Sequence, residues 1–189
     1  MHGHRSERIG GAVSESGISE ANINLAIALK LQNLLEQSGA TVILTRSTDE
    51  AIYDTNADGS MRKKKVSDLK NRVKIGNESS ADIFVSIHLN KIPQEQYYGW
   101  QTFYKNNDEQ SKRLAESIQN NLNSSIQKEN HRLAKIIENI YIVDHVEIPM
   151  TIVECGFLSN QEELNDLQKE EYQERLAWGI YNGIMDWFQ

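Results

Sequence analysis

One apolar run interrupted by a single acid lies near the end of the chain, at Thr151–Leu158 with Glu154 inside it. A short apolar run that meets a glycine, here Gly156, and is followed by a polar helix start at Asn160 is typical of a buried strand. Such strands belong to sheets that helices cover, and ligands bind there outside the carboxyl ends of the strands. A buried carboxylate is costly unless it is paired, hydrogen-bonded or close to a metal. Glu154 is therefore either an acid held by neighbouring N–H groups or part of a functional site.

The rest of the chain alternates between helical and strand patterns. Helices are predicted where apolar residues recur at the 3.6-residue period, over 20–37, 66–76, 108–127 and 176–187. Four more strands are predicted from short β-branched or aromatic runs at 41–46, 81–90, 99–104 and 139–143. Residues 47–65 are expected to form a long loop. This alternation predicts an α/β fold, one domain over 1–189, with a central mixed, mostly parallel sheet flanked by helices on both faces.

Composition limits the partners. The 189 residues carry a formal net charge of −7, which argues against nucleic acid. The basic run Arg62–Lys65 is interpreted as solvated, with contact to an anionic polymer as the alternative. A single cysteine, Cys155, allows no intrachain disulfide. The sequence has no run of ~18 apolar residues, which is the length that would predict a transmembrane segment. Residues 1–6 lack the apolar part of a signal peptide, so an exported protein would have its targeting segment absent from this chain.

Three side chains are of the types that bind zinc in hydrolases: His4 in the polar start, Glu20 at a helix start and His88 at a strand end. Two His and one Glu form a known catalytic zinc set, which leaves a fourth position for water and lowers its pKa to ~7. A further carboxylate such as Glu154 could take the proton of that water and pass it to a leaving amine. Each side chain also has an ordinary alternative. These are a flexible polar segment for His4, complementing a helix dipole for Glu20, and hydrogen-bonded packing for His88.

Three landmarks, in this order, resemble one protein family. They are Glu20 after Gly17-Ile18-Ser19, the strand end Ser86–Asn90, and the segment Val153–Asn160. Together they resemble the zinc-dependent N-acetylmuramoyl-L-alanine amidases of the amidase-3 group. The resemblance extends over nearly the whole chain, from residue 10 to residue 188. The stretch Ser86–Tyr104 is most similar to the germination-specific, spore-cortex (CwlD-like) branch.

The resemblance implies hydrolysis of the amide bond between N-acetylmuramic acid and L-alanine in peptidoglycan, in spore cortex maturation or cell-wall turnover. It implies Zn²⁺ as cofactor, held by His4, Glu20 and His88, with Glu154 as the catalytic glutamate. It also implies an exported protein of the cell envelope or forespore intermembrane space. A lipoprotein or deacetylase is the expected partner in sporulation, besides the peptidoglycan strands and their stem peptides.

Three residues are predicted to bind substrate. Arg132 is similar to a recurrent arginine of the family and is predicted to orient substrate, with a surface helix charge as the alternative. Tyr98 lies in an aromatic turn after the His88 strand and could stack on sugar faces, whereas Trp100 in the same turn is either part of the rim or of the core. Asn90, two residues after His88, is assigned to the same role.

The chain departs from the family at its start. The family begins with a buried strand that ends in Asp-x-Gly-His-Gly, whose His is the first zinc ligand, whereas no such strand precedes Gly10 and Arg5 stands near the expected His. Either the loop has an extra residue and His4 is the ligand, or the natural first strand is missing or replaced. The competing function is a non-catalytic peptidoglycan-binding or scaffold protein with a degraded zinc site.

Overall fold

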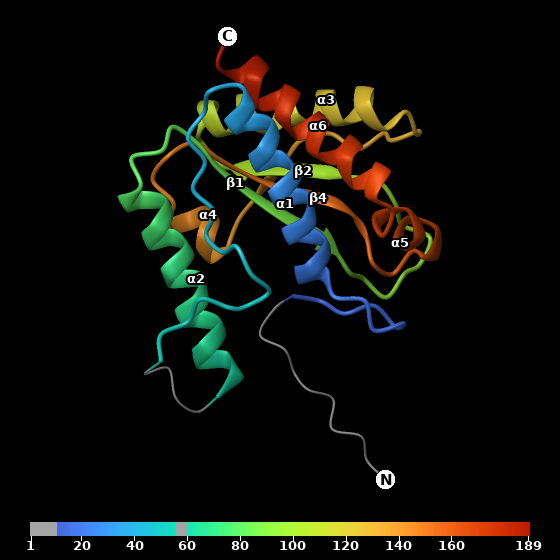
Figure 1. The fold of residues 1–189 in the computed structure, drawn as a ribbon, viewed down its shortest axis with the longest axis horizontal. Helices are drawn as coiled ribbons and strands as arrows, with labels where there is room; N and C mark the ends of the chain where they lie inside the picture. The colour runs from blue at the N-terminus through green and yellow to red at the C-terminus, as the bar shows by residue number, and fades with distance from the viewer. Residues whose placement is uncertain (1–10, 56–59) are drawn as a thin grey trace.

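The structure is a computed structural model that describes residues 11–55 and 60–189 (Figure 1). Its sheet has the strand order β1-β4-β2-β3. The strands are β1 (Phe84–Asn90), β2 (Gln101–Lys105), β3 (Lys135–Ile137) and β4 (Met150–Phe157). β1 is parallel to β4 and β2 is parallel to β3, whereas β2 and β4 are antiparallel. The prediction of a mixed, mostly parallel sheet is confirmed.

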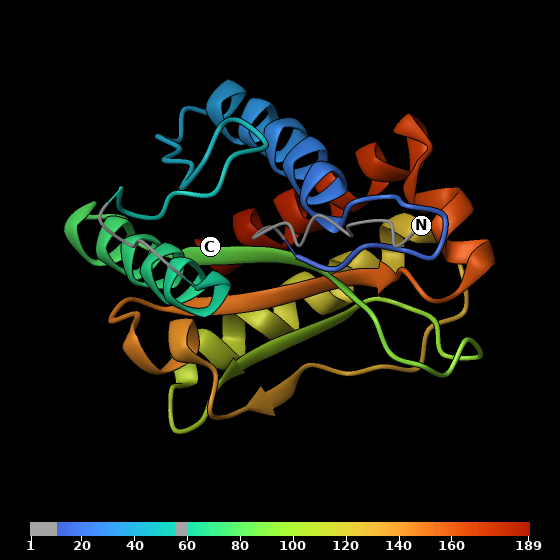
Figure 2. The same cartoon turned by 90° about the horizontal axis from the view of Figure 1, so that it is seen from below.

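Helices cover both faces of this sheet, as predicted. They are α1 (Glu20–Gln37), α2 (Met61–Glu78), α3 (Glu109–Ile126), α4 (Tyr141–His145), α5 (Gln161–Leu167) and α6 (Glu170–Trp187). The long helices α3 and α6 run side by side and α1 packs beside α6, whereas α2 and α4 lie together away from them (Figures 1 and 2). Within the described residues, no helix is long and apolar enough to cross a membrane.

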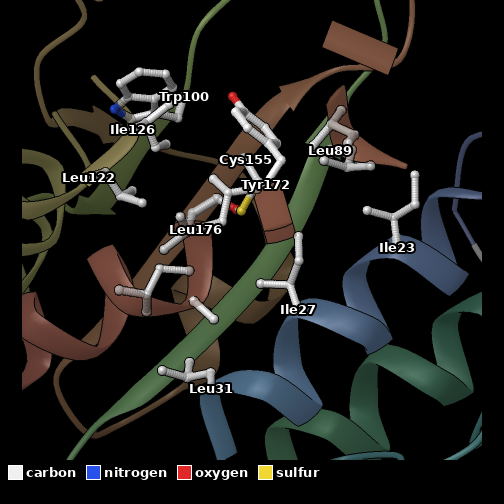
Figure 3. Close-up of a cluster of buried hydrophobic side chains, with 14 of the residues drawn as sticks. Ile23, Ile27, Leu31, Leu89, Trp100, Leu122, Ile126, Cys155, Tyr172 and Leu176 are labelled. Carbon is white, nitrogen blue, oxygen red and sulfur yellow. The ribbon is translucent and has the colours of Figure 1, made fainter. Parts of the chain in front are cut away.

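The alternation of side chains along β4 divides the core into two clusters and directs Glu154. Val153 and Cys155 are fully buried in the larger cluster with α1, α3 and α6, whereas Met150 and Ile152 belong to a smaller cluster with α2 and α4. Figure 3 shows side chains from α1, β1, α3, β4 and α6 meeting in the larger cluster. Glu154 has the same parity as Ile152, so it projects from the α2 and α4 face, beyond the apolar side chains.

Two predicted strands are wrong. Residues Thr41–Arg46 form no strand, and Ile43 is 51% exposed. β-Branched residues favour an extended backbone, but a strand also needs a hydrogen-bonded neighbour, and β1 pairs with β4 alone within the described residues. The strand predicted at 139–143 is instead the start of α4, where Ile142 and Val143 are buried as one helical turn. A short apolar run fits a buried helix as well as a strand.

The helix predicted over 66–76 begins earlier than expected. α2 starts at Met61, where the Ser60 side chain accepts a hydrogen bond from the backbone N–H of Lys63. The basic run Arg62–Lys65 therefore lies in the first turns of a helix and not in the loop. The later start was predicted because the first apolar residue of the helical pattern is Val66, and the basic run before it carries no such period. The expectations for His4, Arg5 and the first strand fall outside the described residues.

We expect Gly183→Ala to destabilise the protein. α6 packs on α3 so closely at this position that a Cβ on Gly183 would lie 2.5 Å from the Ile118 Cα. Overpacking of this kind typically costs about 1–3 kcal/mol, although alanine is the better helix former by about 1 kcal/mol. Urea unfolding measures the change in the free energy of unfolding. Asn182→Ala, one residue away, is the control and should change it by less than about 0.5 kcal/mol. A Gly183→Ala protein as stable as wild type would contradict this close packing.

Candidate active site

Three polar side chains form a row across the sheet on the α2 and α4 face. His88 of β1 is opposite Glu154 of β4, and Glu154 is opposite Gln101 of β2. Side chains at paired positions project from the same face of a sheet. At the other end of this face, Phe84 and Ile152 pack against apolar residues of α2 and α4. The row therefore lies toward the carboxyl ends of the parallel strands β1 and β4, where α/β proteins bind ligands.

Glu20, the first residue of α1, extends this row on the β1 side. Its Oε2 accepts a 2.6 Å hydrogen bond from the Ala12 N–H, and its Oε1 accepts bonds from Asn24 Nδ2 at 3.1 Å and the Leu89 N–H at 3.3 Å. Burial alone would raise the pKa of this carboxyl, but His88 and the backbone donors outweigh burial and lower it. Gly11 is required beside it, because its φ is +68° and a Cβ would lie 2.6 Å from Glu20 Oε2.

The imidazole of His88 is fixed from both sides. Nδ1 lies 3.2 Å from Glu20 Oε1, and Nε2 lies 2.8 Å from the Ser86 hydroxyl oxygen. Two ligands of a tetrahedral zinc at ~2.0–2.1 Å are separated by roughly 3.3 Å, so the Glu20–His88 spacing fits two positions of one zinc site. A histidine that binds metal usually has a hydrogen-bond partner on its other ring nitrogen, and the Ser86 hydroxyl supplies it.

Glu154 differs from Glu20 in having a buried oxygen without a partner. Its Oε2 makes no hydrogen bond within the described part of the chain. Burial raises the pKa of Glu154 to about 7, with a smaller opposing effect from His88 and a raising effect from Glu20. Glu154 Oε2 therefore does not fit the alternative in which neighbouring N–H groups hold the acid. A carboxyl with a pKa near neutrality is suited to accepting and then donating a proton.

The described residues supply two metal donors. Within 11–55 and 60–189, no cluster of three or more His, Cys, Asp or Glu side chains is placed to hold a metal, so Glu154 does not join Glu20 and His88 as a third donor. The predicted first ligand, His4, lies outside this part of the chain. His131 and His145 are exposed.

Two of the residues predicted to bind substrate, Arg132 and Tyr98, lie on the β2 side of the row, and the third, Asn90, lies on the β1 side. Arg132 is half-buried in the segment between α3 and β3, not on a helix. Its Nε donates to the Tyr98 carbonyl at 2.8 Å and its Nη1 donates to Gln101 Oε1 at 3.1 Å. The Tyr98 side chain is 50% exposed, whereas Trp100 is buried and its Nε1 donates to Asn123 Oδ1. Trp100 is therefore a core residue. Asn90 ends β1, and its carbonyl accepts a bond from the Leu158 N–H.

Two residues of this site were not identified from the sequence, Gln101 and Glu163. Buried Glu163 accepts 2.8 Å hydrogen bonds from the Gly99 N–H and the Phe157 N–H, and thereby joins the aromatic turn to the end of β4. Burial raises the pKa of Glu163 more than these two donors lower it. The signal available was Asn160-x-x-Glu163, a capping-box pattern before α5. Gln101 had no signal of its own, because its role depends on its position opposite Glu154.

Comparisons with known proteins identify the family of the chain. Residues 1–186 match the model of the Amidase_3 family, N-acetylmuramoyl-L-alanine amidase. The chain is 37% identical over 179 residues to the germination-specific N-acetylmuramoyl-L-alanine amidase of Bacillus subtilis, covering 95% of this chain and 74% of that protein. It is 28% identical over 181 residues to the amidase LytC of Bacillus subtilis, covering 95% of this chain but only 33% of LytC.

Solved structures share the fold. The CwlD amidase of Clostridioides difficile, solved in complex with the GerS lipoprotein, matches with a TM-score of 0.91 and 45% identity, over 94% of this chain and 91% of that one. An N-acetylmuramoyl-L-alanine amidase from Clostridium difficile 630 matches with a TM-score of 0.81 and 31% identity, over 94% and 89%. The chain therefore belongs to the N-acetylmuramoyl-L-alanine amidase family, whose enzymes hydrolyse the bond between N-acetylmuramic acid and L-alanine in peptidoglycan.

Proposed function

We propose that this amidase is zinc-dependent, with His4, Glu20 and His88 as metal ligands and Glu154 as the catalytic residue. The observation that carries the proposal is the unpaired, buried Oε2 of Glu154 beside the Glu20–His88 pair. The spacing of that pair fits zinc, and Glu154 remains free for a different task. The whole chain, 1–189, is proposed to be a single catalytic domain.

In this mechanism the chain's residues hold the metal and move one proton. Bound zinc would supply a Lewis acid for the scissile carbonyl and lower the pKa of a bound water to ~7. Glu154 accepts a proton from the attacking water as that water adds to the carbonyl carbon. Glu154 then donates the proton to the L-alanine nitrogen as the C–N bond breaks, which regenerates the carboxylate. The products are a lactyl carboxylic acid and a stem peptide with a free amine.

Substrate contacts are proposed for Arg132, Tyr98 and Asn90. The exposed ring of Tyr98 is available for stacking on a sugar face, and Arg132 lies at the β2 end of the row. Asn90 lies at the carboxyl end of β1, two residues after His88. All three therefore lie around the carboxyl ends of the strands that carry His88 and Glu154.

The proposed setting is spore cortex maturation or cell-wall turnover. It is supported by the names of two similar proteins, a germination-specific amidase and an amidase solved with a lipoprotein. We infer accordingly that the protein acts outside the cytoplasm, in the cell envelope or forespore intermembrane space. A lipoprotein or deacetylase is the proposed partner, and peptidoglycan strands with stem peptides are the substrate.

Zinc binding should depend on His88. Wild-type protein is expected to hold close to one equivalent of zinc, and His88→Ala should lose it, because the remaining ligands cannot maintain a structured site. Metal analysis of dialysed protein measures the content, and His131→Ala, which removes an exposed histidine, is the matched control. Full zinc occupancy in His88→Ala would remove His88 from the site. A wild-type chain without zinc affinity would support the non-catalytic, peptidoglycan-binding alternative.

Glu154→Gln should separate chemistry from metal binding. Glutamine keeps the size of the side chain but cannot accept the proton of water, so kcat should fall about 10²–10⁴-fold while zinc content stays the same. Release of stem peptide from muropeptides measures kcat. The control is Glu162→Gln on α5, which neutralises an exposed glutamate. Turnover of Glu154→Gln close to that of wild type would be incompatible with the proposed proton transfer.

The same substitution should change how the stability of metal-free protein depends on pH. The pKa of Glu154 is about 7 in the folded state and near 4.5 in the unfolded chain, so the folded state binds more protons between these values. Stability from this group is present below about pH 4.5 and is lost as pH rises through about 7. Thermal melting should therefore find Glu154→Gln more stable than wild type at pH 8, by up to about 3 kcal/mol, with little difference at pH 4.5. The opposite order at pH 8 would indicate a structural carboxylate.

A further inference from the structure

We propose that the Arg132 guanidinium, positioned by Gln101, binds the free α-carboxylate of the second stem-peptide residue. In peptidoglycan the residue after L-alanine is D-glutamate joined through its side-chain carboxyl, so its α-carboxylate is free unless it is amidated to D-isoglutamine. The enzyme should therefore prefer stem peptides with D-glutamate at this position. This inference rests on the proposed function, and adds the recognised group, the direction of the peptide and a role for Gln101.

Arg132 is a cation without an acidic partner. Its two hydrogen-bond acceptors are the Tyr98 carbonyl and Gln101 Oε1, both uncharged, and its guanidinium lies 4.8 Å above the Phe157 ring. Within residues 11–55 and 60–189, no carboxylate forms an ion pair with Arg132. The charge of Arg132 lowers the pKa of Glu163 slightly, but the two carboxylate oxygens of Glu163 accept hydrogen bonds from the N–H groups of Gly99 and Phe157.

The donor geometry that remains suits a carboxylate. A guanidinium has five N–H donors in a planar fork, and Arg132 uses Nε and one N–H of Nη1. Its Nη2 has no acceptor within the described part of the chain. Two neighbouring N–H groups of such a fork match the two oxygens of a carboxylate. A half-buried arginine held by neutral acceptors keeps its charge available for an anionic ligand.

Gln101 connects Arg132 to the row that contains Glu154. Gln101 is opposite Glu154 on the neighbouring strand, about 4.8 Å away, and Arg132 Nη1 lies 3.1 Å from the Gln101 side-chain oxygen. The guanidinium is therefore one side chain removed from the Gln101 position in the row. The α-carboxylate of the second residue is five bonds from the scissile nitrogen, and two extended residues span roughly 7 Å.

The row also gives the peptide a direction. Glu20 and His88 lie on the β1 side of Glu154, whereas Gln101 and Arg132 lie on the β2 side. The scissile carbonyl oxygen belongs with the proposed metal ligands, and the leaving nitrogen must face Glu154. The lactyl and sugar part of the substrate is therefore placed toward β1, and the stem peptide continues across Glu154 toward Arg132.

Two muropeptides that differ only at this carboxyl test the proposal, one with D-glutamate and one with D-isoglutamine after L-alanine. With zinc-loaded wild type we expect kcat/KM for the acid to exceed that for the amide by about tenfold or more, since hydrogen bonds between charged groups are lost on amidation. Arg132→Gln should bring the ratio close to one, mainly through loss on the acid substrate. Gln101→Leu, which removes the acceptor that orients Arg132, should reduce the ratio in part.

Arg175→Gln is the matched control, because it removes an exposed α6 arginine that pairs with Glu171, and it should leave the ratio unchanged. Equal kcat/KM for both muropeptides in wild type would overturn the inference while leaving the amidase function intact, and so would a preference that survives in Arg132→Gln. Cleavage of neither muropeptide would overturn the proposed function, and this inference with it. If Arg132→Gln does not fold, Arg132→Lys keeps the charge without the fork and should give an intermediate ratio.

Discussion

The site depends on the register between β1 and β4. His88 pairs with Glu154 only because Phe84 pairs with Met150 at the start of the same ladder. Side chains alternate, so a slip of one residue would turn Glu154 into the apolar cluster that now holds Val153 and Cys155. Those two fully buried side chains therefore hold the carboxylate on the opposite face. The apolar packing that makes the strand stable also places its one acid.

Two glutamates close to one another have opposite acid–base behaviour because of their donors. Burial would raise the pKa of Glu20, but His88 and the backbone N–H groups of Ala12 and Leu89 lower it overall. Glu154 has a buried oxygen with no donor, so burial raises its pKa to about 7. Hydrogen bonding thus favours the charged form of Glu20, whereas burial without a donor favours the protonated form of Glu154. The first state suits a metal ligand and the second suits a group that carries a proton.

Local patterns predicted the parts of the fold that local physics determines. The helical period gave α1, α3 and α6, and the apolar runs gave β1 and β4, because burial on one face fixes those patterns. The run at 139–143 was misassigned because one buried turn of helix has the same composition as a strand. Glu20, His88 and Glu154 were found from landmarks in the sequence. Their proximity was implied by the family resemblance and not by any local pattern, since Glu20 and His88 are 68 residues apart. Gln101 and Glu163 were missed because Arg132 lies 31 residues from Gln101 and Gly99 lies 64 residues from Glu163.

The ends of the parallel strands β1 and β4 are held by glutamates from the starts of two helices. Glu20 opens α1 and accepts the Leu89 N–H of β1, and Glu163 lies in the first turn of α5 and accepts the Phe157 N–H of β4. An acid at a helix N-terminus complements the helix dipole, so each glutamate is favourable there before it contacts a strand. For Glu20 this explanation therefore does not compete with a role at the site. The helix start fixes where the Glu20 carboxylate lies. The N–H group that Glu20 accepts belongs to Leu89, which directly follows His88 at the end of β1.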